Sequence, residues 1–355
     1  MVGIIFLGEL EVCPYLKKYT DVLDRLGIAY EIISWNRGGR LDAPAANELV
    51  FQRPSKKMVH PIRKLLDFWL FGRFAARAVR SRGYEKLVVL TTLTGMLLYR
   101  LLTRQYRGSY IFDYRDASYE YLPFFRHFLK QLVAKSNFTC ISSRGFLDIL
   151  PAGYDYTIAH NFRYCDLSAR KQKMQKKQQD PIIVSYIGVL READYLKQLI
   201  DLFGDDLRFW FYIHGGGENE QQLQEHAARY QNVFVSGTYA PNQKQGLVEA
   251  ADILCYNYPA SFINNPALAN KYYDGLIYKK PFFANGETYS GQLIQSQGLG
   301  FCVKGYGDSA VCDALYQYYR ALDPATFTAR AEACLEEVLA EDRQYIDRIE
   351  QFFRL

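Results

Sequence analysis

Short apolar runs rich in Val, Ile, Phe and Tyr alternate along almost the whole chain with segments whose apolar residues recur at helical spacing. This alternation is typical of βαβ units, in which helices join and cover parallel strands. The sequence therefore predicts an α/β protein. In the first half we expect strands at 2–7, 29–35, 86–92, 109–114, 137–143 and 155–161, and helices near 13–26, 60–82, 95–106, 121–135 and 144–150.

A polar, basic stretch divides the pattern in two. Residues 169–180 contain almost no apolar side chain, which is typical of a linker or an exposed loop. The alternation then restarts at Pro181. Strands are expected at 182–188, 207–215, 232–237, 252–257, 281–285 and 300–303, and helices near 193–203, 218–229, 242–250, 266–278, 289–297 and from 308 to the end.

Two doubly wound parallel sheets facing across a cleft would follow from this order, with ligands at the carboxyl ends of the strands. We expect an N-terminal domain over 1–165, a basic linker over 166–180 and a second domain over 181–335. A helix is expected over 336–355, and this helix could pack back on the N-terminal domain.

Composition excludes several classes of protein. With 355 residues, 49% apolar and 23% charged, the chain can bury a large core, so we do not expect disorder. The apolar run Leu87–Tyr99 is too short to cross a bilayer, and the N-terminus lacks a basic leader region, so we expect a cytosolic protein. Seven scattered cysteines without a CxxC pair, and histidines without HExxH spacing, predict reduced thiols and no metal site.

Charge is unevenly distributed. Through Cys165 the chain has 24 Lys and Arg against 14 Asp and Glu, whereas the remainder has 19 against 24. A basic half with many aromatic residues could meet nucleic acid or the anionic inner leaflet of a membrane, since both present dense phosphate charge. Composition does not choose between these two partners.

The segment Asn264–Asn285 carries the clearest chemistry. Lys271 and Asp274 lie three residues apart on an expected helix that starts at Pro266, so both face one side. An ammonium group and backbone N–H groups suit a phosphate, and a carboxylate suits ribose hydroxyls. The alternative is a surface ion pair of little energetic value.

These residues resemble the C-terminal half of GT-B glycosyltransferases, and more closely the family 4-like retaining enzymes of bacterial capsule, O-antigen and exopolysaccharide synthesis. Asp274 takes the place of the second Glu of the family's E-x7-E motif, whereas Pro266 replaces the first. The matching run is Pro266, Lys271, Asp274, Lys279, Lys280 and Pro281. The resemblance implies a GT-B fold and a nucleotide-sugar donor linked to UDP or GDP, and it implies neither a cofactor nor a metal ion.

Further strand ends match the same pattern. Gly188, Arg191 and Lys197 resemble the turn and the two cations that hold the donor diphosphate. The resemblance also implies donor-side roles for Gly8, Gly216, Gly237 and Tyr239. For each of these the alternative is an ordinary solvated cation or a plain strand-to-helix turn.

On the acceptor side, Asp113, Arg115 and Asp116 cluster at the end of an expected central strand and resemble the D-x-R-D of related transferases. The resemblance implies a catalytic role for Asp113 beside Arg191 and Lys197, and acceptor contacts for Arg115, Asp116, His160 and Asn161. The alternative is an Arg–Asp network that braces the loop.

Two expected helices, within 56–86 and 121–135, interleave cations with aromatic residues, which is typical of helices that settle on a membrane. The family's use of polyprenyl-diphosphate-linked acceptors implies a peripheral place at the inner face of the cytoplasmic membrane, without nucleic acid. The alternative is an ordinary core stripe with a solvated face. For the whole chain, the alternatives to a transferase are a GT-B subunit that binds without catalysis and a nucleotide-sugar epimerase.

Overall fold

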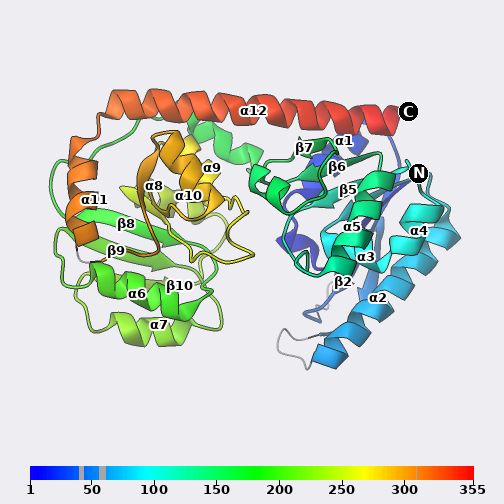
Figure 1. Cartoon of the computed structure of the whole chain (residues 1–355), viewed down its shortest axis with the longest axis horizontal. Coiled ribbons are helices and arrows are strands. Elements are labelled where there is room, and N and C mark those ends of the chain that lie inside the picture. Colours follow the sequence, from blue (N-terminus) through cyan, green and yellow to red (C-terminus); the bar gives the residue numbers. More distant parts are fainter. Residues whose placement is uncertain (40–43, 56–60, 309) are drawn as a thin grey trace. The chain divides into compact units, whose positions relative to one another are not determined.

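The structure is a computed structural model that describes residues 1–39, 44–55, 61–308 and 310–355. The chain divides into two compact units (Figure 1). The first unit comprises Met1–Asn161 together with Ala340–Leu355, and the second comprises Phe162–Leu339.

The first unit is built on a seven-stranded sheet of order β3-β2-β1-β4-β5-β6-β7, in which all neighbouring strands are parallel. Its strands are β1 (Val2–Phe6), β2 (Tyr30–Asn36), β3 (Glu48–Gln52), β4 (Lys86–Leu90), β5 (Tyr110–Tyr114), β6 (Phe138–Ile141) and β7 (Tyr156–Ile158). Its helices before residue 161 are η1 (Leu10–Val12), α1 (Leu16–Leu26), α2 (Pro61–Arg82), α3 (Thr92–Leu97), α4 (Tyr99–Arg104), α5 (Pro123–Lys135) and η2 (Arg144–Asp148).

Helices cover both faces of this sheet. On one face, Phe71, Ala75 and Val79 of α2 share a core with Leu129 and Leu132 of α5. On the other face, apolar residues of α1 pack with those of the C-terminal helix, and that core comprises Tyr19, Val22, Leu23, Tyr345, Ile349, Phe352 and Phe353 among others. The strands β1, β4, β5 and β6 are therefore buried from both sides, as expected for a parallel sheet, whereas the edge strand β3 is only partly buried.

The second unit has a six-stranded parallel sheet of order β10-β9-β8-β11-β12-β13. Its strands are β8 (Ile182–Ile187), β9 (Phe209–His214), β10 (Val233–Gly237), β11 (Ile253–Tyr256), β12 (Phe282–Asn285) and β13 (Gly300–Val303). Its helices are η3 (Tyr164–Lys171), α6 (Ala193–Phe203), α7 (Glu220–Ala227), α8 (Lys244–Ala250), α9 (Lys271–Tyr278), α10 (Tyr289–Ser296) and α11 (Ala310–Ala321), followed by α12 (Pro324–Arg354). The predicted pair of Rossmann-like parallel sheets is confirmed.

Several local expectations differ from the structure. Strand β3 was not predicted, and the helix expected near 95–106 is divided into α3 and α4. The predicted helix over 266–278 begins only at Lys271, because 261–270 form turns in which Asn265 Oδ1 accepts a hydrogen bond from the Ser261 N–H at 2.9 Å. The segment 166–180, expected as an exposed linker, contains buried side chains at Ala169 and Met174, which join the core of the second unit. Ala169 and Met174 therefore anchor this segment to the core of the second unit.

Helix α12 contributes to both units. Phe327, Leu335 and Val338 lie in the core of the second unit, and Tyr345 and Phe352 lie in that of the first. Residues up to Leu339 belong to the second unit and those from Ala340 to the first.

Candidate nucleotide site and its surroundings

The carboxyl ends of β8, β9 and β10 form a tight edge in the second unit. Hydrogen bonds continue beyond the strands, from the Gly188 N–H to the His214 carbonyl at 2.9 Å and from the Gly215 N–H to the Gly237 carbonyl at 2.9 Å. A Cβ added at Gly215 would lie 1.8 Å from the Gly188 oxygen, so only glycine fits there. The Gly turn of this chain thus brings two backbones into direct contact.

Lys271, the first residue of α9, lies beside this edge. Its Cε is 3.5 Å from the point where a Cβ of Gly188 would stand, so the turn after β8 and the lysine adjoin. The side chain is buried, with 5% of its surface exposed. Of the described residues, no carboxylate lies within ion-pair distance of its ammonium group, and its hydrogen bond goes to the Cys255 carbonyl at 3.3 Å.

Aromatic rings surround the Lys271 ammonium group. Nζ lies 3.2 Å from the ring centre of Tyr186 and 4.7 Å from that of Tyr258. These cation–π contacts replace part of the lost hydration. Burial nevertheless disfavours the charged form and lowers the pKa of Lys271 to about 7.

Two further groups lie close to this cage. The amide Nδ2 of Asn257, a fully buried residue directly after β11, has no hydrogen-bond partner among the described residues, while its Oδ1 accepts from Tyr195. Arg191 is exposed. Burial raises the pKa of both Tyr186 and Tyr258, and the Arg191 charge opposes this rise to a smaller extent, so the guanidinium lies near both rings. The structure therefore places Gly188, Arg191 and Lys271 in one neighbourhood.

Lys197 has a different environment. Its ammonium group donates to Gln222 Oε1 at 3.1 Å and lies 3.7 Å from Asp194. These partners belong to α6 and α7. The structure thus holds Lys197 between these two helices and shows no contact between it and Lys271.

Asp274 is buried but does not pair with Lys271. Its Oδ1 accepts a hydrogen bond from Lys244 of α8 at 2.7 Å, and burial raises its pKa. Burial raises the pKa of Tyr239, and the negative charge of Asp274 raises it further. The surface ion pair weighed as the alternative is absent here, because both Lys271 and Asp274 are buried and Lys244 is the partner.

The turns after β9 and β10 lie next to each other and beside the carboxylate of Glu220. A Cβ on Gly237, whose φ is +76°, would lie 2.5 Å from Glu220 Oε1, and a Cβ on Gly216 would lie 2.0 Å from Thr238 Oγ1. Gly216 and Gly237 are thus adjacent, as expected from their strand ends. The sequence analysis did not identify Glu220. Its place in the first turn of α7, directly after the Gly turn, could have identified it as a residue of this edge.

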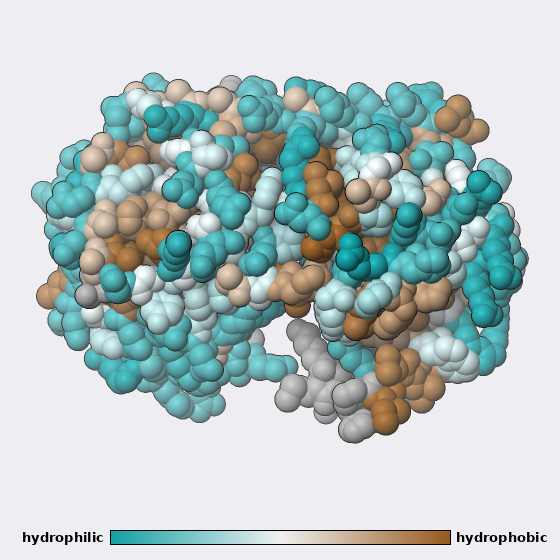
Figure 2. Space-filling model, in the orientation of Figure 1, coloured by the Kyte–Doolittle hydropathy of each residue, from teal (hydrophilic) through white to brown (hydrophobic). Residues whose placement is uncertain are grey.

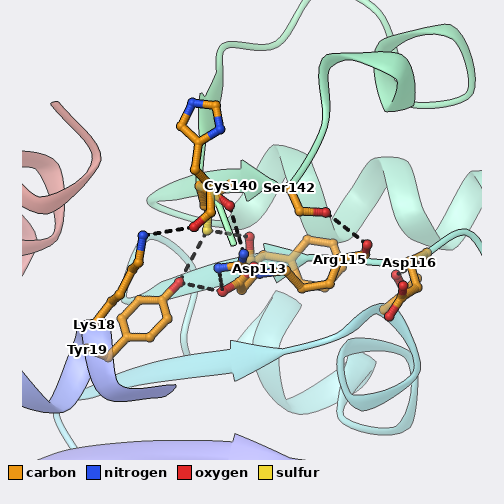
Figure 3. A network of polar contacts seen from close by, with 11 residues as sticks. Lys18, Tyr19, Asp113, Arg115, Asp116, Cys140 and Ser142 are labelled. Carbon is orange, nitrogen blue, oxygen red and sulfur yellow. Dashed lines mark hydrogen bonds and ion pairs between the residues drawn. The ribbon is translucent and has the colours of Figure 1, made fainter. Parts of the chain in front are cut away.

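In the first unit, Asp113 is the centre of a closed polar network (Figure 3). Its carboxylate is fully buried and accepts hydrogen bonds from Arg115 Nε at 2.5 Å, from a terminal nitrogen of Arg115 at 2.8 Å and from Tyr19 at 2.8 Å. Both oxygens are occupied. This geometry supports the alternative weighed above, an Arg–Asp brace.

The network extends to the C-terminal helix. Arg115 also donates to the Ala159 carbonyl at 2.8 Å. His160 is buried and its Nε2 lies 2.7 Å from Glu341 of α12, while Lys18 donates to the His160 carbonyl and pairs with Asp342. These polar groups tie α1, β5 and the end of β7 to α12.

The remaining first-unit positions differ from Asp113 in exposure. Asp116 is exposed and is drawn in the same polar network in Figure 3, and Asn161 is half-buried. Gly8 follows β1, and its carbonyl accepts from the Trp35 N–H at 3.1 Å. Within residues 1–39, 44–55, 61–308 and 310–355, no three His, Cys, Asp or Glu side chains form a potential metal site.

Solved structures share this fold. A glycosyltransferase from Rickettsia africae is 12% identical, with 99% of this chain and 98% of that chain covered and a TM-score of 0.67. A sucrose-phosphate synthase from Thermosynechococcus elongatus is 14% identical, with coverage of 99% and 98% and a TM-score of 0.69. The HepE protein of Anabaena, solved with UDP and glucose, is 12% identical, with both chains covered to 98% and a TM-score of 0.62.

No family model matches the chain, and no curated protein matches it. At the identities of the solved structures, the similarity shows the fold, which is the GT-B arrangement of two Rossmann-like units.

Proposed function

We propose that this chain is a retaining glycosyltransferase that needs neither a metal ion nor an organic cofactor. The second unit binds a UDP- or GDP-sugar, and the acceptor is a saccharide linked to polyprenyl diphosphate at the inner face of the cytoplasmic membrane, in surface polysaccharide synthesis. The full-length likeness to glycosyltransferase structures supports the class of reaction. The structure of HepE with UDP and glucose supports a nucleotide sugar as the donor.

One observation carries the proposal: the buried Lys271 ammonium group beside Gly188 lacks an anionic partner among the described residues. An unpaired buried cation is costly, and a bound diphosphate would supply the missing negative charge. The Asn257 amide is a second unsatisfied donor in the same region. In the transfer, the bond between the anomeric carbon and the diphosphate oxygen breaks while the acceptor hydroxyl oxygen bonds to that carbon. The hydroxyl proton passes to the departing diphosphate oxygen, and fixed cations stabilise the negative charge of the diphosphate.

Lys271→Met tests this assignment by calorimetric titration with UDP and GDP. Loss of a charged hydrogen bond is expected to weaken nucleotide binding by about 10- to 100-fold. Lys280→Met is the matched control, because Lys280 is also buried but donates to the carbonyls of Glu249 and Ala251. Equal binding by wild type and Lys271→Met would refute the diphosphate site.

A binding subunit without catalysis is the second candidate, favoured by Pro266 in place of the family's first Glu. The two candidates differ in turnover. Release of nucleoside diphosphate from a panel of nucleotide sugars, in the presence of lipid-linked acceptors, supports the transferase. Nucleotide binding without release across the panel supports the binding subunit, and interconversion of the donor sugar would indicate an epimerase.

A further inference from the structure

Helix α2 of the first unit exposes an apolar stripe. Ile62, Leu65, Leu66 and Trp69, which we call the α2 ridge, are 71%, 66%, 48% and 51% exposed. Their spacing of three and four residues places them on one side of the helix. The opposite side, with Phe71, is buried. Figure 2 shows apolar side chains gathered over the start of α2.

The ridge continues into a basic groove. This cavity of about 640 Å³ is lined by Trp69, Gly72, Arg73, Arg77, Arg80 and Leu97, so Trp69 belongs to both features. The Arg73 guanidinium lies 4.7 Å from the ring centre of Trp69. The helix therefore presents apolar residues in its first two turns and arginines in the following ones.

The positive charge of the groove is not neutralised by any residue that the structure describes. The α2 sequence has six Lys or Arg residues and one acidic residue, Asp67, which is buried and pairs with Arg53 at 2.6 Å. In the described parts of the chain, no carboxylate lies within ion-pair distance of Arg73, Arg77 or Arg80. These exposed guanidinium groups are therefore free to bind an anion from outside.

A second exposed aromatic group lies on the same side of the first sheet. Phe124 and Phe128 of α5 are 62% and 39% exposed. Helices α2 and α5 share one core, to which Phe71 and Leu129 contribute. The apolar surface is thus not confined to a single helix.

We propose that the α2 ridge and the arginine groove dock this protein on a membrane of anionic phospholipid. The ridge enters the headgroup boundary, and Arg73, Arg77 and Arg80 bind lipid phosphates. A nucleic acid would pair with the arginines but would leave Ile62 and Leu65 in water, so the combination favours a lipid surface. This inference specifies the membrane attachment in the proposed function but requires no nucleotide.

Vesicle sedimentation tests the surface with the full chain and with vesicles of phosphatidylcholine alone or with phosphatidylglycerol. Binding is expected only with phosphatidylglycerol, and Arg77→Gln/Arg80→Gln is expected to weaken it at least tenfold. Lys17→Gln/Arg25→Gln is the matched control: it removes the same charge from exposed positions of α1, which packs on the other face of the sheet. The control is expected to bind like wild type.

Insertion is measured in a Trp210→Phe background, which leaves Trp69 as the exposed indole of the described chain because Trp35 is fully buried. Phosphatidylglycerol with brominated acyl chains is expected to quench its fluorescence. Equal binding to both kinds of vesicle, absence of quenching, unchanged binding of the arginine variant, or displacement from vesicles by duplex DNA would each overturn the inference. UDP and GDP titrations of the same variants are expected to match wild type, so failure here is distinguishable from failure of the nucleotide site.

Discussion

Lys271 and Lys280 are buried to similar degrees, 5% and 8% exposed, but their surroundings differ. Lys280 donates to two main-chain carbonyls, at 2.8 and 2.6 Å. Lys271 has one long hydrogen bond and two aromatic rings. Buried polar groups are normally satisfied, so a residue such as Lys271 is the stronger indication of a ligand.

Proton uptake on nucleotide binding follows from the pKa of Lys271, which burial lowers to about 7. At pH 8 the free protein holds this amine mainly neutral, and a bound diphosphate favours the charged form. We expect binding at pH 8 to take up a proton, seen by calorimetry as a dependence of the binding enthalpy on the buffer's ionisation enthalpy. Lys271→Met should abolish that dependence, and a wild-type enthalpy that is the same in all buffers would contradict the mechanism.

The same group affects stability in a defined direction. Because its folded pKa lies below its ordinary value of 10.5, the unfolded chain binds more protons between about pH 7 and 10.5. The contribution of Lys271 to the free energy of unfolding therefore rises with pH across this window. Lys271→Met is expected to stabilise the free protein more at pH 7 than at pH 10 in urea unfolding, and an equal effect at both pH values, or the opposite order, would show that folding does not lower the pKa of this amine.

Asp113 shows how one sequence pattern fits two functions. A D-x-R-D cluster at a strand end suits both an acceptor site and a brace, and the choice depends on Tyr19, which is distant in the sequence but donates to the carboxylate. Asp113→Asn is expected to lower the free energy of unfolding by about 3–5 kcal/mol, because it leaves Arg115 buried without its counter-charge.

The control for Asp113 is Asp148→Asn at an exposed position, for which urea unfolding is expected to change by less than about 0.5 kcal/mol. A loss of transfer activity by Asp113→Asn without loss of stability would instead support the catalytic role that the family resemblance implies.

Among the elements, α9 depends on close packing. A Cβ at Gly275 would lie 2.0 Å from Cζ of Phe282 in β12, so the helix approaches the sheet where a side chain is missing. This contact sets the position of Lys271, one turn earlier in the same helix. The lysine's position therefore results from helix-to-sheet packing as well as from its own contacts.

Gly275→Ala is expected to destabilise the second unit by about 1–3 kcal/mol, because the added methyl group overpacks against Phe282. Gly246→Ala is the matched helical control: no atom lies within 4 Å of its added Cβ, and a gain of about 0.4–1 kcal/mol is expected from reduced freedom of the unfolded chain. Urea unfolding followed by Trp210 fluorescence, in a chain with Trp35 and Trp69 replaced by Phe, measures both. Similar effects of the two substitutions would contradict the packing argument.

The sequence pattern predicted most elements because parallel strands buried on both faces are continuous apolar runs. Strand β3 was missed because ELVFQ is short and only partly buried at the sheet edge. The late start of α9 was missed because the turns of 261–270 depend on contacts such as that between Asn264 Nδ2 and Glu192 Oε1 at 3.0 Å, from a distant segment. Local periodicity does not contain that information.

At the scale of the whole molecule, the family resemblance implied that Gly188 and Lys271 share one donor site, and the structure places them side by side. The same resemblance implied Lys197, which instead donates to Gln222 of α7. Strand order follows from regular topology, whereas the direction of a long side chain depends on which acceptor lies within reach. The sequence also predicted which helices carry the basic surface. It did not predict that Phe71 is buried and that Ile62 is exposed.

The division of α12 between two cores leads to the last prediction. Phe327 and Phe352 are almost equally buried, at 2% and 3% exposed, but Phe327 packs in the second unit and Phe352 in the first. Each Phe→Ala substitution removes similar apolar contact, expected to cost about 3–5 kcal/mol. Because the cores are separate, Phe352→Ala should lower the urea midpoint reported by Trp35 more than that reported by Trp210, and Phe327→Ala should do the reverse.

Single-tryptophan versions of the chain, in which the other two tryptophans are replaced by Phe, provide the two reporters. If both substitutions shift both midpoints equally, α12 couples the units into one cooperative transition. In that case a defect at either end of the helix would weaken the proposed nucleotide site through loss of global stability. If the midpoints separate, the second unit can keep its nucleotide site while the first unfolds, and binding of UDP or GDP should then raise only the Trp210 midpoint.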